Sequence, residues 1–198
     1  MASKKEEEKT IGVKTILIGD LGVGKTSLIN ATIGMKFNPL ERTTISANFV
    51  KKEMIIDNKK YLIHLWDTAG QEKLKALTKL FYKGSNIIIF VYDITDEKTF
   101  TNLEKWIEDV KDTLENKYIC GIVGNKKDLY LKEVVKEDRA KEFAKLYQMK
   151  FKLVSAKEDP KGFVDFLEEL IVDAKSFLVP KEDRTLSRKK TKREHCKC

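Results

Sequence analysis

The sequence GDLGVGKTS, residues 19–27, carries the strongest structural signal in the chain. It follows an apolar β-branched run, VKTILI at 13–18, and matches G-x-x-x-x-G-K-[ST] where a strand gives way to a helix. Glycines in this pattern let backbone N–H groups converge on phosphate oxygens, and the helix N-terminus adds partial positive charge. The stretch therefore predicts an α/β fold that binds a nucleoside triphosphate, without naming the base.

The chemistry of this loop assigns a role to its residues. Lys25 is expected to reach the terminal phosphates, and the Thr26 hydroxyl to coordinate Mg²⁺. The predicted phosphate-binding residues are Gly22, Val23, Gly24, Lys25, Thr26 and Ser27.

Strand-like and helix-like segments alternate along the rest of the chain. Apolar runs lie at 13–18, 62–66, 86–92, 118–124 and 150–155, and helical periodicity at 99–115, 136–147 and 162–178. This alternation predicts right-handed βαβ units and a mostly parallel sheet with helices on both faces. An exception is FVKKEMIIDNKKYLIHLW, two strand-like runs joined at DNKK, which predicts an antiparallel hairpin at a sheet edge. We therefore expect six strands, one of them antiparallel.

Base selection is predicted from the loop GNKKD at 124–128. The Asp128 carboxylate can accept hydrogen bonds from both N1–H and the exocyclic amine of guanine, a donor pair that adenine lacks. The loop SAK at 155–157 offers a backbone N–H for guanine O6. Taken alone, the N-K-x-D match can arise by chance in a lysine-rich chain, but three loops in the right order favour guanine. The predicted base-binding residues are Asn125, Lys126, Asp128, Ser155, Ala156 and Lys157.

Hydrolysis and magnesium binding are predicted from WDTAGQE at 66–72. Asp67 is the expected carboxylate that holds Mg²⁺ through its water ligands, the Gly70 N–H can bond the γ-phosphate, and Gln71 can orient the attacking water. Thr44 is the expected second hydroxyl ligand of Mg²⁺. We expect it to contact the γ-phosphate only when GTP is bound.

The length of 198 residues suits one globular domain, which we expect at 11–178. Residues 1–10 are expected to be a flexible extension, and 179–198 a disordered basic tail. The apolar run at 87–92 is too short to span a bilayer. The N-terminus lacks the apolar core of a secretory signal, and its second residue is Ala2 instead of the glycine that myristoylation requires. We therefore expect a cytosolic location.

The tail holds eight Lys or Arg against three Asp or Glu at 181–198, within a chain of net charge +8. Such a segment suits nucleic acid, an anionic membrane or solubility, although it has no aromatic residues for RNA contact. Cys196 and Cys198 are too close in sequence for an unstrained disulfide, and with His195 they lack the second cluster of a zinc site. Cys120 is expected to be a small buried hydrophobic residue.

With these loops placed, the chain from about Lys14 to Leu178 resembles the Ras superfamily of small GTPases, and more closely the Rab family. GDLGVGKTSL, WDTAGQE, FVYDIT, GNKKD and SAK are similar to that family's motifs, in its order. Trp66 before DTAGQE and the C-x-C ending are Rab-like. The resemblance implies a P-loop small GTPase fold, stacking of Phe37 on guanine, and geranylgeranyl groups on Cys196 and Cys198.

The same resemblance implies a switch that binds GTP or GDP with Mg²⁺, hydrolyses GTP slowly and recruits trafficking effectors. Its implied partners are an activating protein, an exchange factor, a GDP-dissociation inhibitor and effectors, with no nucleic acid, and the protein is expected to be a monomer. Its implied location is the cytoplasmic face of an intracellular membrane, in exchange with the cytosol. TTISANF and YDITDEKTF are similar to the endocytic branch, which implies endosomes. The alternative is a Ras- or Ran-like signalling or transport GTPase.

Some positions depart from the Rab pattern and put the effectors in question. ISANF, KLKAL and FYKGS replace the usual residues of the switch segments, although Phe49, Trp66 and Phe81 match the aromatic triad that reports nucleotide state to effectors; their alternative role is ordinary core. Leu21 stands where Ras proteins have Gly, beside the expected γ-phosphate. We expect it to crowd Gln71 and slow hydrolysis, so a GTP-dependent binding module with negligible turnover is a second hypothesis.

Overall fold

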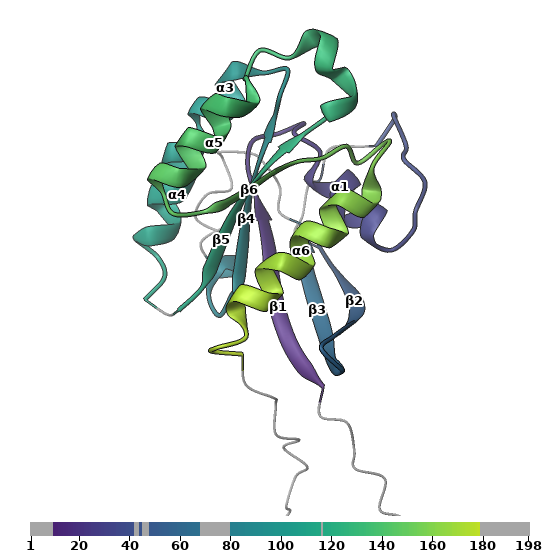
Figure 1. Ribbon diagram of the computed structural model, residues 1–198, viewed down its shortest axis with the longest axis vertical. Helices are drawn as coiled ribbons and strands as arrows, with labels where there is room; N and C mark the ends of the chain where they lie inside the picture. The colour runs from purple at the N-terminus through teal and green to yellow at the C-terminus, as the bar shows by residue number, and fades with distance from the viewer. Residues whose placement is uncertain (1–9, 42–43, 45–47, 68–79, 116, 179–198) are drawn as a thin grey trace, which may run out of the picture.

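The computed structural model describes residues 10–41, 44, 48–67, 80–115 and 117–178 (Figure 1). Its centre is a six-stranded sheet of order β2-β3-β1-β4-β5-β6. The strands are β1 (Ile11–Ile18), β2 (Asn48–Ile56), β3 (Lys59–Asp67), β4 (Ile87–Asp93), β5 (Ile119–Asn125) and β6 (Lys150–Leu153). The predicted extension falls almost wholly, and the predicted tail wholly, outside the described residues.

The sheet is parallel except at the β2 edge, which pairs antiparallel with β3. Asp57 and Asn58 connect these two strands with φ of 49° and 56°. Two consecutive residues with positive φ are what a tight hairpin between twisted strands requires, and Asp and Asn tolerate that conformation. The predicted mixed sheet with one antiparallel edge strand is confirmed.

Helices cover both faces of the sheet, as predicted. α1 (Lys25–Thr32) and α6 (Pro160–Ala174) pack on one face, whereas α3 (Glu97–Thr101), α4 (Leu103–Lys111) and α5 (Glu137–Leu146) pack on the other. A 3₁₀ helix, η2 (Lys127–Lys132), follows β5. Figure 1 shows that β1 begins and α6 ends at the same end of the molecule, opposite to α1. Among the helices of the described ranges, none has the length and apolar character to cross a bilayer.

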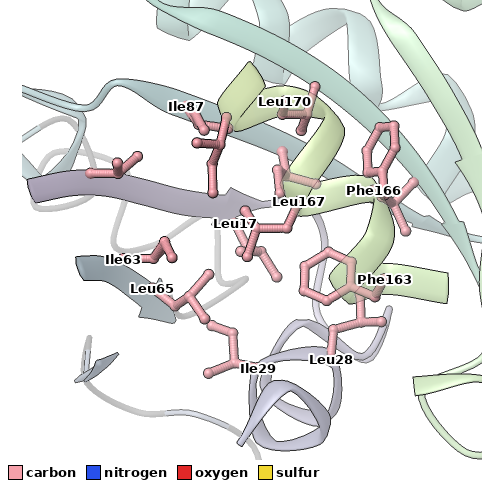
Figure 2. Close-up of a cluster of buried hydrophobic side chains, with 14 of the residues drawn as sticks. Leu17, Leu28, Ile29, Ile63, Leu65, Ile87, Phe163, Phe166, Leu167 and Leu170 are labelled. Atoms are coloured by element: carbon pink, nitrogen blue, oxygen red, sulfur yellow. The ribbon is translucent and has the colours of Figure 1, made fainter. Parts of the chain in front are cut away.

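The helix α6 illustrates how the sequence pattern builds the core. Asp159 caps its N-terminus by accepting a hydrogen bond of 2.9 Å from the Gly162 N–H, and Pro160 occupies the first turn, where no N–H is needed. Its apolar stripe packs on the sheet and on α1 (Figure 2), with Phe163, Phe166, Leu167 and Leu170 fully buried. Truncating such a buried aromatic residue to Ala typically costs about 3–5 kcal/mol.

The segment predicted as one helix at 99–115 differs from the prediction at both ends and in the middle. It begins earlier, at Glu97, because the Asp96 side chain accepts a hydrogen bond of 3.0 Å from the Lys98 N–H. Asn102 separates α3 from α4 while keeping φ of −71° and ψ of −12°, near helical values. Periodicity alone shows neither the cap nor this interruption.

Cys120 lies on β5 and packs partly buried against the cluster of the second face, close to its predicted role. Burial raises the pKa of its thiol to about 12.

Candidate nucleotide-binding site

A cavity of about 490 Å³ opens where the phosphate loop and the loops after β5 and β6 meet. Parallel strands end on the same side of the sheet, so loops far apart in sequence converge there. The predicted residues that line it are Gly22, Gly24, Lys25, Thr26, Ser27, Phe37, Thr44, Asn125, Lys126, Asp128, Ala156 and Lys157. The volume lies within the range of small-molecule sites.

The phosphate loop is held in place by the last residue of β5. Asn125 donates from Nδ2 to the Val23 carbonyl at 2.8 Å and accepts the Ala156 N–H on Oδ1 at 3.2 Å. Gly24 has φ of 96°, and a Cβ there would lie 2.3 Å from Asn125 Nδ2. Only glycine fits both constraints. One amide therefore joins the three predicted loops, and Val23 contributes as a buried member of the scaffold.

Lys25 lies at the base of the cavity and is almost fully buried. Its Nζ donates to the carbonyls of Gly19 and Asp20, each at 2.8 Å. Burial lowers the pKa of Lys25 to about 8, while the carboxylates of Asp67 and Asp20 oppose that shift. A phosphate placed here would supply the strong negative partner that a buried ammonium lacks.

Three oxygen-bearing side chains meet beside this lysine. Thr26 Oγ1 lies 2.7 Å from both Thr44 Oγ1 and Asp67 Oδ2, and Thr44 Oγ1 lies 3.2 Å from the same carboxylate oxygen. Burial raises the pKa of Asp67, and its Oδ1 is buried without a hydrogen-bond partner among the described residues. Hydroxyl and carboxylate oxygens suit Mg²⁺, and an unsatisfied buried oxygen fits a site for a hydrated cation.

The base side of the cavity is built around Asp128. Its Oδ1 accepts the Ser155 hydroxyl at 2.6 Å, and its Oδ2 lies 4.0 Å from Lys157 Nζ. Ser155 does not line the cavity but orients this carboxylate. Phe37 also lines the cavity and has 42% of its surface exposed, which leaves part of the ring available for stacking.

Lys126 has a partner that the sequence reading did not identify. Its Nζ forms an ion pair of 2.5 Å with Asp93 Oδ2, at the carboxyl end of β4, and Asp93 Oδ1 accepts from the Thr95 N–H and hydroxyl. This ion pair could have been anticipated from the order of the strands. Asp93 and Asn125 are the last residues of two neighbouring strands, so the Asp93 carboxylate lies beside the loop that follows Asn125.

Several predicted residues lie outside the described part of the chain. These are Gly70, Gln71, Cys196 and Cys198. Leu21 is described, lines the cavity and is 51% exposed, so its side chain reaches the space expected to hold phosphate.

Phe49, Trp66 and Phe81 form a continuous group that we call the aromatic surface. The Phe49 and Trp66 rings stack at 5.1 Å, and Trp66 and Phe81 lie 5.7 Å apart. Lys14 Nζ lies 5.1 Å from the Trp66 ring centroid and donates to the Phe81 carbonyl at 2.6 Å. Phe49 is 45% exposed, while Trp66 and Phe81 pack partly buried against the core. The aromatic surface is therefore partly core and partly exposed.

Comparisons with known proteins agree with this geometry. The family model described as Ras family matches residues 14–175. Ras-related protein Rab-30 of Homo sapiens is 38% identical over 165 residues, covering 82% of this chain and 81% of that protein. Ras-related protein SEC4 of Saccharomyces cerevisiae is 42% identical over 147 residues (74% and 68%), and Ras-related protein Rab-21 of Geodia cydonium is 38% identical over 168 residues (85% and 73%).

Proposed function

The chain belongs to the Ras family of small GTPases, on its Rab branch, and we propose that the cavity at its strand ends binds GTP and GDP together with Mg²⁺. Proteins of this family hydrolyse GTP to GDP, and Rab proteins act in membrane trafficking, so this chain is a GTPase of that class. The proposal for the site rests chiefly on one observation: Thr26, Thr44 and Asp67 converge beside the buried Lys25.

Different residues of the cavity bind different parts of the nucleotide. Lys25 and the backbone N–H groups of the phosphate loop bind the β- and γ-phosphates, and Asp128 accepts the donors of guanine. Thr26, Thr44 and Asp67 hold the metal site. Mg²⁺, when bound there, neutralises charge on the phosphate oxygens. We propose Gln71 as the residue that orients the attacking water, and Gly70 as a γ-phosphate contact.

The position of Thr44 suggests how the switch works. Two contacts hold Thr44 at the metal site, one with the Thr26 hydroxyl and one with the Asp67 carboxylate. GTP would retain it through Mg²⁺ and the γ-phosphate, whereas GDP would release it. Effectors would then read the nucleotide state through the aromatic surface.

Nucleotide binding is tested by titrating the purified protein with fluorescent GDP and ATP analogues in excess Mg²⁺. Tight GDP binding with at least about 100-fold weaker ATP binding is expected, because adenine leaves Asp128 without donors. Equal affinity for the two nucleotides would contradict the assignment of the base site.

We further propose that Cys196 and Cys198 carry isoprenoid groups that hold the protein on intracellular membranes. Two lipid chains anchor stably where one anchors marginally, and the basic residues at 188–193 add attraction to an anionic leaflet. α6 ends at the end of the sheet where β1 begins (Figure 1), whereas the cavity lies at the carboxyl ends of the strands, so the tail would start on the side of the domain away from the nucleotide site. The finer location proposed is endosomal.

The anchor is tested in cells with the double variant Cys196→Ser, Cys198→Ser. It should shift from membranes to cytosol, and the single variants should shift only partly. A double variant that stays membrane-bound would rule out the lipid anchor. Staining with endosomal markers then tests the finer location.

A second candidate function is a GTP-dependent binding module with negligible turnover. Leu21 favours it, since this branched side chain lines the cavity where water and an activating arginine must approach. Single-turnover hydrolysis of wild type and Leu21→Gly separates the two functions. A faster Leu21→Gly variant supports steric inhibition, and equal rates contradict it.

A further inference from the structure

The phosphate loop contains an acidic residue whose position needs explanation. Asp20 immediately precedes Leu21 and Gly22, which line the cavity. A carboxylate aimed at bound phosphates would repel them. Among the described residues that line the cavity Asp20 is absent, so its side chain has another place.

That place is the start of α4. Asn102 Nδ2 donates to Asp20 Oδ2 at 2.6 Å, and Trp106 Nε1 donates to Asp20 Oδ1 at 2.8 Å. These donors stand 82 and 86 residues further along the chain. Both carboxylate oxygens are thus bound by the N-terminal cap residue of α4 and by its first turn, with Trp106 buried in the core of that face.

The contact of Asp20 helps to hold the N-terminal end of the phosphate loop, where Gly19 is also held. Gly19 approaches β4 so closely that a Cβ would lie 2.1 Å from the Val91 carbonyl. At its other end, the Val23 carbonyl is held by Asn125. Between these attachments, the exposed Leu21 marks the free part of the loop.

We propose that Asp20, Asn102 and Trp106 form a latch that positions the phosphate loop and slows nucleotide release. The latch turns the carboxylate away from the phosphates and fixes the backbone of Asp20, whose carbonyl also accepts from Lys25. All three are positioning residues, since they act on the nucleotide through the loop. This inference rests on the proposed guanine-nucleotide site, and it makes α4 a second control point for that site.

The latch is tested by the release rate of a fluorescent GDP analogue from Asp20→Asn and Trp106→Phe in excess Mg²⁺. Asp20→Asn should release GDP about tenfold faster than wild type, because the substitution removes the negative charge and one of the two acceptor oxygens and turns an NH₂ donor toward a donor of the partner side chains. Trp106→Phe keeps the packing but removes one donor, so about threefold is expected. The double variant should be faster than wild type by less than the product of the two single effects, because both changes act on the same side chain at position 20.

The control is Ile107→Ala on the same helix, which removes buried volume from a residue that cannot hydrogen-bond to Asp20. It should lower the melting temperature and leave GDP release within twofold of wild type. The ³¹P resonance of the bound β-phosphate should shift in Asp20→Asn and Trp106→Phe and stay in place in Ile107→Ala.

The outcomes separate the latch from the site on which it depends. If wild type does not bind GDP, both proposals are overturned. If wild type binds GDP but the Asp20 and Trp106 variants release it at the wild-type rate, only the latch is overturned. Equally fast release from Ile107→Ala would show an effect of stability, and would also overturn the latch.

Discussion

The nucleotide cavity and the aromatic surface are held together by different forces. The cavity is lined by apolar and polar residues, and its polar side chains have fixed partners, such as Asn125 with Val23 and Asp128 with Ser155. The aromatic surface is held by ring contacts, including one between Phe49 and His64, and by Lys14. Buried polar groups are costly to leave unpaired, whereas stacked rings can be exchanged for other apolar groups at small cost.

The two regions also differ in how closely their sequences resemble the family. Apart from Leu21, the motifs of the cavity resemble those of the family, while ISANF and FYKGS, which contain Phe49 and Phe81, differ from its usual residues. A polar site specifies one ligand because each group needs its own partner. An apolar surface can change its partners while the fold and the nucleotide site stay intact.

The largest effect is expected on the cavity side, from Asp128→Ala. The affinity for GDP should fall by about 100-fold or more, because the donors of guanine lose their charged acceptor. Competition titration with fluorescent GDP measures this loss. Asp165→Ala, which removes an exposed ion pair with Lys161 on α6, is the matched control and should bind GDP like wild type.

A second change on the cavity side concerns Asp67, which joins the two threonines. Asp67→Asn should weaken Mg²⁺ binding by about 10- to 100-fold, as loss of an outer-shell carboxylate typically does. GDP release measured across a Mg²⁺ titration gives the apparent Mg²⁺ affinity. A titration curve that coincides with that of wild type would place the metal elsewhere.

Lys14→Met tests the aromatic surface through its lysine. The unfolding free energy should fall by about 1–2 kcal/mol, since the carbonyls of Phe81 and Lys83 lose a charged donor. GDP affinity should remain within twofold of wild type. Urea unfolding and the GDP titration, run on the same preparation, distinguish the two effects.

The smallest effect on folding is expected from Phe49→Ala. Because Phe49 is half exposed, the loss should be about 0.5–1.5 kcal/mol, mainly from its stacking on Trp66. Nucleotide binding should be unaffected, while GTP-dependent capture of effectors should fail. A Phe49→Ala protein that loses GDP affinity would show that the two regions are not independent.

Much of the fold and the site followed from local sequence patterns. The edge hairpin was visible because DNKK joins two strand-like runs, and the phosphate loop because its glycines and lysine have fixed spacing. Asn125 was predicted among the base-binding residues, and its hydrogen bond to the Val23 carbonyl became visible only in the structure. The ion pair of Lys126 with Asp93 was missed, since neighbouring strands brought together residues 33 positions apart.

The sequence by itself predicted a guanine nucleotide as the ligand. Phosphate and guanine are each recognised by a few neighbouring residues, whose spacing, glycines and charges can be read from the sequence. The tertiary structure was needed to show what holds those loops. In the sequence Asp20 is only a variable position of the phosphate-loop motif. In the structure its carboxylate accepts hydrogen bonds from Asn102 and Trp106, at the start of α4. The geometry of a loop depends on neighbouring residues and can be predicted from them. A hydrogen bond between residues far apart in sequence forms only after packing has brought its donor and acceptor together.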